Sequence, residues 1–203
     1  MVHFSVGNYI ANLFWSFTIY VLPIMVLNLL EAKANAYFFI AWTIGGVLGT
    51  VSLATTTALF AEGSFDEKRL ASDIWRCLKI TLIILIPPVI IVGVFADKIL
   101  LLYGNEYSIE GASLLRMMAL AALPLSINNI YFSVLRIKRK MKILILLAVL
   151  IAAVTLSLSY TLLPRVGIIG PGIGWLVSQG IVAAGIVIIF LLRRYRINRR
   201  LNT

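Results

Sequence analysis

Six long apolar stretches run through this chain of 203 residues and constrain its fold more than any other feature. A helix needs about 20 mainly apolar residues to cross the hydrocarbon core of a bilayer. Such stretches occupy about residues 7–30, 36–60, 80–95, 112–135, 143–163 and 168–192. The sequence therefore predicts an all-α polytopic membrane protein, with six transmembrane helices in a single domain over residues 1–203.

Composition excludes a soluble protein of the usual kind. Hydrophobic residues make up 61% of the chain and charged residues only 13%, whereas soluble domains carry about 25% charged residues. No stretch rich in Pro or Ser marks a second module. We therefore look for a function inside the membrane.

The basic residues alternate between the two ends of the predicted helices. Of the 18 Lys and Arg residues, 14 fall in three clusters, at 68–79, 136–142 and 193–200. The other four are Lys33, Lys98, Arg116 and Arg165, at the opposite helix ends. The positive-inside rule then predicts a multi-pass membrane protein with both termini, including a basic tail over 193–203, in the cytoplasm. Such clusters attract anionic membrane lipids, and we do not expect nucleic acid as a partner.

Two connectors between the apolar stretches are amphipathic. Residues 64–79 begin with Ser64 and Glu67 at the spacing of a capping box, and Leu70, Ile74 and Trp75 share one helical face. We predict an interfacial helix over 64–79 on the cytoplasmic side. The second connector, 96–111, contains a Gly104-Asn105 turn signal, and we expect it to rest on the outer surface.

Polar residues inside the apolar stretches are the candidate site residues. In the first stretch, Asn8, Asn12, Ser16 and Tyr20 follow one another at i+4 spacing and so share a face. A polar face of this kind is unfavourable against lipid hydrocarbon. Two interpretations remain open, namely hydrogen bonding between helices and the wall of a polar cavity.

Three amides lie at mid-span. Asn128 and Asn129 are adjacent and point about 100° apart on a helix, so at least one must meet a neighbouring helix or water. Gln179, in the last stretch, also needs a polar partner. Substrate contact and helix packing both remain open for these residues.

Arg116 is the one charged residue predicted about a turn inside a span. A charge at this depth is by default a functional hypothesis. Arginine can snorkel to the interface, and its guanidinium also suits a phosphate group in bidentate geometry. Both interpretations are kept.

The residue types needed for membrane-embedded catalysis are scarce. The only histidine, His3, precedes the first predicted span, the only cysteine is Cys77, and no carboxylate falls at mid-span. Covalent catalysis needs a nucleophile beside a base. We therefore expect no enzymatic activity, no metal site and no cofactor.

Several segments together resemble a known family. These are NYIANLF (8–14), AYFFIAW (36–42), LFAEGS (59–64), ILLLYGNEYSIEGASLLRMMALAALPLSINNIYFSVLRIKRK (99–140) and LLPRVGIIGPGIGWLVSQ (162–179). In order and spacing they resemble the carboxy-terminal half of prokaryotic polysaccharide-biosynthesis flippases. Those proteins belong to the multidrug/oligosaccharidyl-lipid/polysaccharide exporter superfamily.

The resemblance implies a lobe of a transporter that moves lipid-linked oligosaccharide from the cytoplasmic to the outer leaflet. In that family two six-helix lobes enclose a cavity that opens alternately to each side. Complete members carry twelve to fourteen helices, so this chain corresponds to one lobe. Its partner would be an amino-terminal lobe of the same product, a separate half, or a second copy of itself.

On this interpretation, the substrate cavity is lined by Asn12, Ser16, Asn128 and Asn129, with Arg116 holding an anionic group and Gln179 as a further candidate. Two alternatives stay open. One is a multidrug-type exporter lobe, which the lack of a mid-span carboxylate for ion coupling disfavours. The other is a non-transporting scaffold or accessory subunit of a glycan assembly complex, with the polar stripes buried against a partner.

Overall fold

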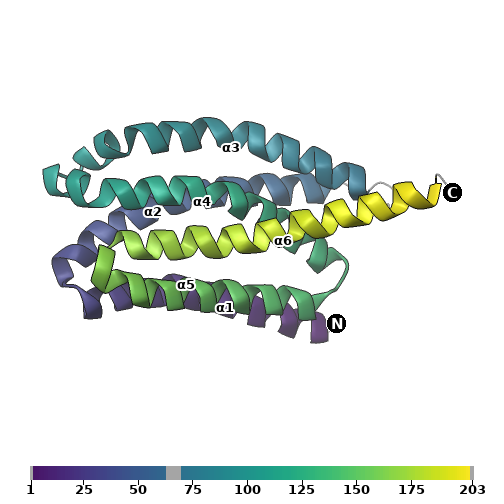
Figure 1. Cartoon of the computed structure of the whole chain (residues 1–203), viewed down its shortest axis with the longest axis horizontal. Helices are drawn as coiled ribbons and strands as arrows, with labels where there is room; N and C mark the ends of the chain where they lie inside the picture. Colours follow the sequence, from purple (N-terminus) through teal and green to yellow (C-terminus); the bar gives the residue numbers. More distant parts are fainter. Residues whose placement is uncertain (1, 63–69, 202–203) are drawn as a thin grey trace.

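The chain forms a bundle of long helices (Figure 1). The computed structural model describes residues 2–62 and 70–201. Within these residues the elements are α1 (Val2–Leu29), α2 (Ala32–Glu62), α3 (Leu70–Leu101), α4 (Asn105–Ile137), α5 (Met141–Val166) and α6 (Ile169–Leu201), and no strand occurs.

Successive helices run in opposite directions, so both termini lie at one end of the bundle (Figure 1). We call this the terminal end. The opposite end, which we call the hairpin end, holds the turns between α1 and α2, α3 and α4, and α5 and α6. Glycines Gly104 and Gly167 have φ of 130° and 66° in two of these turns, values that a residue with a Cβ atom rarely adopts. Short turns of this kind keep sequential helices antiparallel.

All six helices contain a segment that is long and apolar enough to cross a membrane. The shortest of these segments, Ile169–Leu192, has 24 residues, and at 1.5 Å per residue this exceeds the roughly 30 Å of a bilayer core. Large apolar side chains such as Tyr20, Ile83 and Leu146 point outward, each more than 59% exposed. The predicted all-α multi-pass membrane protein is confirmed.

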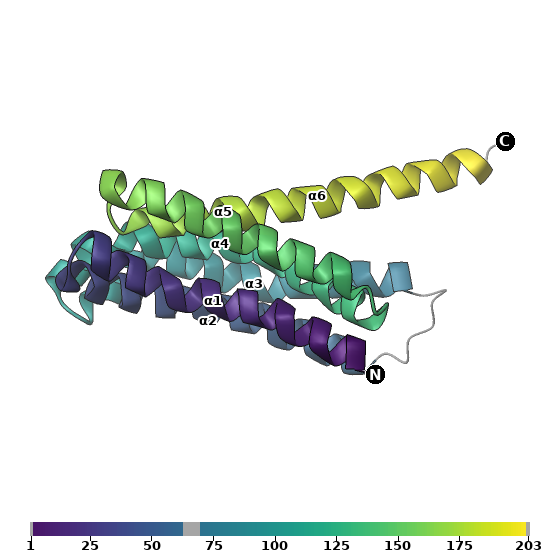
Figure 2. The same ribbon diagram turned by 90° about the horizontal axis from the view of Figure 1, so that it is seen from below.

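Helix α4 is the centre of the bundle. In its most apolar window 61% of the residues are buried, against 17–33% in the other helices. It packs on α3, α2 and α6, while α1 packs mainly on α5. Figure 2 shows α1 and α2 together along one edge, with the last turns of α6 extending beyond the other helices. A polar side chain of α4 is therefore placed to reach most parts of the molecule.

Close backbone contact fixes α6 against its neighbours. A Cβ atom on Gly172 would lie 2.7 Å from Leu114 Cδ1 of α4, and one on Gly174 would lie 2.9 Å from the carbonyl oxygen of Thr155 in α5. Small residues at helix contacts let backbones approach, which is the main source of helix packing energy in membranes. Helices α4, α5 and α6 thus form a tightly packed unit.

Both predicted amphipathic connectors differ from the structure. Residues 70–79 are the first turns of α3 and continue without a break into the membrane-spanning segment Ile74–Leu101, and residues 64–69 lie outside the described residues. Residues 96–111 form the last part of α3, which is kinked at Phe95 (φ −101°, ψ 18°), then a short turn and the start of α4. The kink coincides with the predicted end of the third apolar stretch at residue 95. Amphipathic periodicity over 70–79 identified a helix but not its continuation into α3. Similarly, the helix predicted to end near 192 continues to Leu201.

Candidate functional site

A groove runs between α1 and α2 on the edge of the bundle. Its walls come from α1 and α2, and its floor comes mainly from α4, with smaller parts of α5 and α6. Its volume is about 280 Å³. We call it the α1–α2 groove, and its lining residues are Ala11, Asn12, Trp15, Ile19, Trp42, Gly45, Gly46, Gly49, Thr50, Leu53, Met118, Ala122, Leu125, Asn129, Phe132, Arg136, Leu144, Ala148 and Trp175.

Arg136 provides the one charged side chain of the groove. Its Nε donates a hydrogen bond to Asn8 Oδ1 at 2.9 Å, and its Nη2 donates to Asn12 Oδ1 at 3.3 Å. Both acceptors are neutral amides on α1, and among the side chains that the structure describes no carboxylate pairs with Arg136. A guanidinium has five N–H donors, so among the side chains that the structure describes part of its hydrogen-bonding capacity is unused and no carboxylate balances its charge.

The position of Arg136 along the bundle is equally informative. It is the penultimate residue of the spanning segment Asn105–Ile137, and Asn8 lies one turn inside the segment Phe4–Leu29. Both residues are at the terminal end. The guanidinium therefore lies near one end of a segment long enough to cross a membrane, with the rest of the groove extending toward the middle of the bundle.

Three tryptophans gather in the inner part of the groove. Trp175 makes edge-to-face contacts with Trp15, at 5.2 Å between ring centroids, and with Trp42, at 5.5 Å. Phe38 stacks on the far side of Trp42 at 5.3 Å. Such aromatic pairs hold one another in fixed orientations. The groove is thus polar and cationic at one end and aromatic at the other.

Two of the predicted site residues, Asn12 and Asn129, line the groove. Asn129 Nδ2 donates to Ser52 Oγ over a long 3.4 Å, so the amide is only weakly engaged. Ser16, also predicted, is half-buried on α1 but is not one of the lining residues. The polar stripe predicted on the first helix therefore meets the groove at Asn12, while Ser16 does not reach it.

Asn128 and Gln179 lie elsewhere, in the packed interior between α4 and α6. Asn128 Nδ2 donates to Gln179 Oε1 at 2.7 Å and to the Gln179 carbonyl at 3.1 Å, and both side chains are fully buried. The adjacent Ser178 points toward α5, where its hydroxyl bonds the Thr155 hydroxyl at 2.7 Å. For these two amides the structure supports the packing interpretation, because neither lines a cavity.

Arg116 faces away from the groove. Its Nε donates to the Gly93 carbonyl at 3.2 Å and its Nη2 lies 3.6 Å from Asp97 Oδ1, both on α3. The guanidinium is therefore engaged by α3, on the opposite side of α4 from α1. The predicted phosphate-holding role of Arg116 is not supported by this position.

Sequence reasoning missed Arg136 because it was grouped with the loop cations at 136–142. A signal was present, since Asn129, Ser133 and Arg136 are spaced i, i+4, i+7 and so lie on one face of α4. That polar stripe parallels the one on α1. Together the two stripes indicate where α1 and α4 face the same space.

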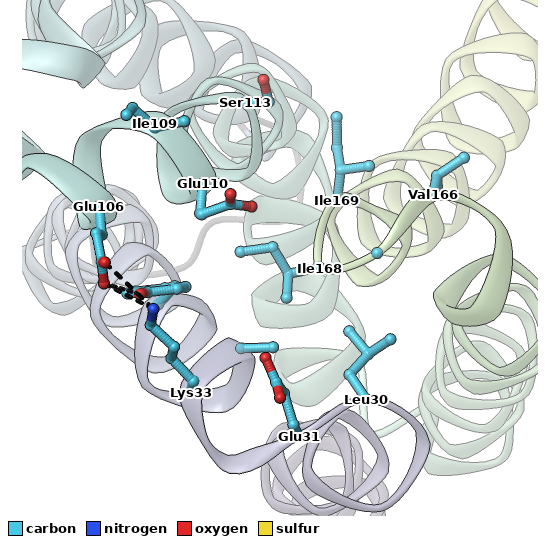
Figure 3. A pocket seen from close by; sticks show the side chains of 13 residues that line it. Leu30, Glu31, Lys33, Glu106, Ile109, Glu110, Ser113, Val166, Ile168 and Ile169 are labelled. Carbon is cyan, nitrogen blue, oxygen red and sulfur yellow. Dashed lines mark hydrogen bonds and ion pairs between the residues drawn. The ribbon is translucent and has the colours of Figure 1, made fainter.

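A second cavity, of about 540 Å³, opens at the hairpin end (Figure 3). Lys33 Nζ pairs with Glu106 at 3.1 Å, and the Tyr37 hydroxyl donates to the same carboxylate. Glu31 and Glu110 also line the cavity. The lysine and the three carboxylates are exposed, whereas Tyr37 is buried. Among residues 2–62 and 70–201, which the structure describes, no three metal-ligating side chains cluster.

The geometry of the groove is thus that of a site for an amphiphile with an anionic end. Comparison of the sequence and the structure with family models, with curated proteins and with solved structures finds no match.

Proposed function

We propose that this chain is a lobe of a membrane transporter that moves lipid-linked oligosaccharide across the plasma membrane, without covalent change to the substrate. The observation that carries the proposal is Arg136. Its guanidinium lies at the terminal end of its spanning segment, where we place the lipid headgroups, and at the mouth of an apolar groove; its partners among the described side chains are two neutral amides.

Energetics favour an anionic ligand at this place. A charge withdrawn from water is costly unless it is paired. Two amide oxygens satisfy hydrogen bonds of Arg136 but do not neutralise its charge. A phosphate does both, because guanidinium matches its oxygens in bidentate geometry. The phosphate of a lipid carrier reaches this depth while its hydrocarbon stays in the membrane.

The resemblance to polysaccharide-biosynthesis flippases gives the substrate class. The six spanning helices and the polar stripe on α1 agree with one lobe of such a transporter. A second lobe would then face the α1–α2 groove and complete the central cavity that the two lobes of such a transporter enclose. That lobe would come from the same product, from a separate half, or from a second copy. Orientation with both termini in the cytoplasm follows from the positive-inside rule and belongs to the proposal.

Transport can be tested in proteoliposomes that hold the chain with its partner lobe. A fluorescent lipid-linked oligosaccharide placed in one leaflet is followed by its accessibility to a membrane-impermeant quencher. We expect Arg136→Gln to slow movement by at least about tenfold, since one charge-assisted contact is worth roughly 1.5–3 kcal/mol. Equal rates for Arg136→Gln and the unaltered protein would refute the role of the groove.

A scaffold can be distinguished from a transporter by thiol labelling. In a Cys77→Ala background, Asn12→Cys and Asn129→Cys place single thiols in the groove, and Asn128→Cys places one in the packed interior as a control. A transporter predicts that a water-soluble maleimide labels the first two in native membranes but not the third. Protection of all three would favour a scaffold whose partner covers the groove.

A further inference from the structure

The α1–α2 groove is too small and too apolar to hold an oligosaccharide. Its volume of about 280 Å³ lies just below the roughly 300–1,000 Å³ of pockets that enclose a single drug-sized molecule. A chain of several sugars exceeds that space. Whatever part of the substrate enters must therefore be only a fraction of the whole molecule.

The lining gives the chemistry of that fraction. Apart from the three tryptophans, four of the 19 lining residues carry a polar side chain, namely Asn12, Thr50, Asn129 and Arg136. The Thr50 hydroxyl already donates to the Val47 carbonyl of its own helix at 2.7 Å. A sugar ring buried here would leave several hydroxyls without partners, at a cost for each one. Hydrocarbon carries no such cost.

We infer that the groove binds the phosphate of a polyprenyl-type lipid at Arg136 and the adjoining hydrocarbon between α1 and α2, and leaves the sugars outside. The site then recognises the lipid carrier and not the glycan. This inference rests on the proposed function for its ligand, and it goes further by stating which part of that ligand is recognised and in which direction it lies.

The orientation follows from depth. Arg136 lies one residue from the terminal end of its spanning segment, Asn105–Ile137, whereas Trp42 lies 15 residues from the terminal end of the α2 segment, Ala32–Thr57. A lipid in the leaflet at the terminal end would have its phosphate at Arg136 and its hydrocarbon running along the groove toward the tryptophans. The tryptophan cluster then contacts hydrocarbon that lies deeper than the part next to the phosphate.

Gly46 offers a way to block the groove without disturbing the fold. It lines the groove, and a Cβ atom built on it meets no heavy atom within 4 Å. A leucine at this position would fill the open space, and leucine is also a better helix former than glycine. Gly185 on α6 is equally open but lines neither cavity, so Gly185→Leu is a matched control.

The tryptophans supply a direct binding signal. Of the four tryptophans in the chain, Trp15, Trp42 and Trp175 line the groove and Trp75 is an exposed residue of α3. Trp75→Phe therefore leaves a protein whose intrinsic tryptophan fluorescence reports only the groove. The purified Trp75→Phe chain in detergent micelles is titrated with farnesyl phosphate, farnesol and glucose 1-phosphate.

We expect a saturable fluorescence change with farnesyl phosphate, binding at least about tenfold weaker for farnesol, and no change with glucose 1-phosphate. Arg136→Gln should bring the affinity for farnesyl phosphate down to that for farnesol. Gly46→Leu should abolish binding of both, Gly46→Ala should weaken it less, and Gly185→Leu should leave it unchanged. Circular dichroism checks that each variant keeps its helical content.

Two results would overturn the inference. One is binding of glucose 1-phosphate as tight as that of farnesyl phosphate, and the other is unchanged affinity in a folded Gly46→Leu variant. Failure of the proposed function looks different, because farnesyl phosphate would then bind as described while no reconstituted form moves lipid-linked oligosaccharide. Conversely, transport whose rate depends on the sugars but not on Gly46→Leu would uphold the proposed function and refute the inference.

Discussion

At the hairpin end of the bundle, charged side chains join neighbouring helices. Lys33 on α2 lies 3.1 Å from Glu106 on α4, and Arg116 on α4 lies 3.6 Å from Asp97 on α3. At the terminal end, the side-chain partners of Arg136 on the same helix α4 are, within residues 2–62 and 70–201 as described, two neutral amides of α1. The described charges at the hairpin end join helices as ion pairs, whereas Arg136 joins α4 to α1 through neutral partners.

The two arginines of α4 should therefore respond differently to the same substitution. Arg136→Gln should reduce transport by at least about tenfold, while Arg116→Gln should leave it within about twofold, because a surface ion pair contributes little. Transbilayer movement in proteoliposomes measures both. A larger loss from Arg116→Gln than from Arg136→Gln would reverse the comparison.

The next largest effect is expected from substituting a buried amide, and it concerns the stability of the protein and not its transport rate. Asn128→Ala leaves Gln179 buried between α4 and α6 without its partner, and should lower the free energy of unfolding by about 1–2 kcal/mol. Thermal unfolding in detergent measures the change. Asn129→Ala, one residue along, should cost less than about 0.5 kcal/mol because its bond to Ser52 is long.

A double-mutant cycle sharpens that prediction. Replacing both partners, in Asn128→Leu/Gln179→Leu, removes the need for pairing and should cost less than the sum of the two single changes. Strict additivity would mean that the two amides do not depend on each other.

A terminal-end cation should be replaceable at no structural cost. Arg139, in the turn between α4 and α5, has φ of 52°, a left-handed conformation that costs a non-glycine residue roughly 1–2 kcal/mol. Arg139→Gly relieves this strain but gains chain entropy in the unfolded state, so a net stabilisation of about 0.5 kcal/mol is expected. A lower melting temperature for Arg139→Gly would show that this cation does have a structural partner.

The smallest effect is expected at the hairpin end. Lys33→Met removes the exposed pair with Glu106 but leaves the hydrogen bond from Tyr37 to that carboxylate. We expect a slight fall in melting temperature that disappears at high salt, since salt screens exposed charges. A fall that persists at 1 M salt would indicate that packing of the lysine stem matters more than its charge.

The bundle was predictable from the sequence because each span is set by length and hydrophobicity alone. Rotation of each helix about its axis was not, because it depends on which neighbour a face meets. Asn128 and Asn129 look equivalent in sequence, yet one pairs with Gln179 in the interior and the other lines the groove. For the same reason the sequence left both a snorkelling role and a phosphate contact open for Arg116, whose guanidinium instead contacts α3.

The predicted ends of the helices differ from the observed ends where an apolar stretch gives way to a polar one. The segment 70–79 has the amphipathic pattern of a surface helix, and the structure uses it to lengthen α3. Hydropathy marks where a span leaves the hydrocarbon but does not mark where its backbone hydrogen bonding stops. For the same reason Arg136, near the end of its span, was taken for a loop residue.

The close contact of Gly172 and Gly174 with α4 and α5 has a consequence for mutational tolerance. Even an alanine at Gly174 would place its methyl group 2.9 Å from the Thr155 carbonyl oxygen, so the first turns of α6 accept almost no sequence change. Gly46 and Gly185 have room for a side chain by the same criterion, but Gly46 lines the groove. A probe is therefore best attached at Gly185, while the start of α6 should tolerate little change at its glycines.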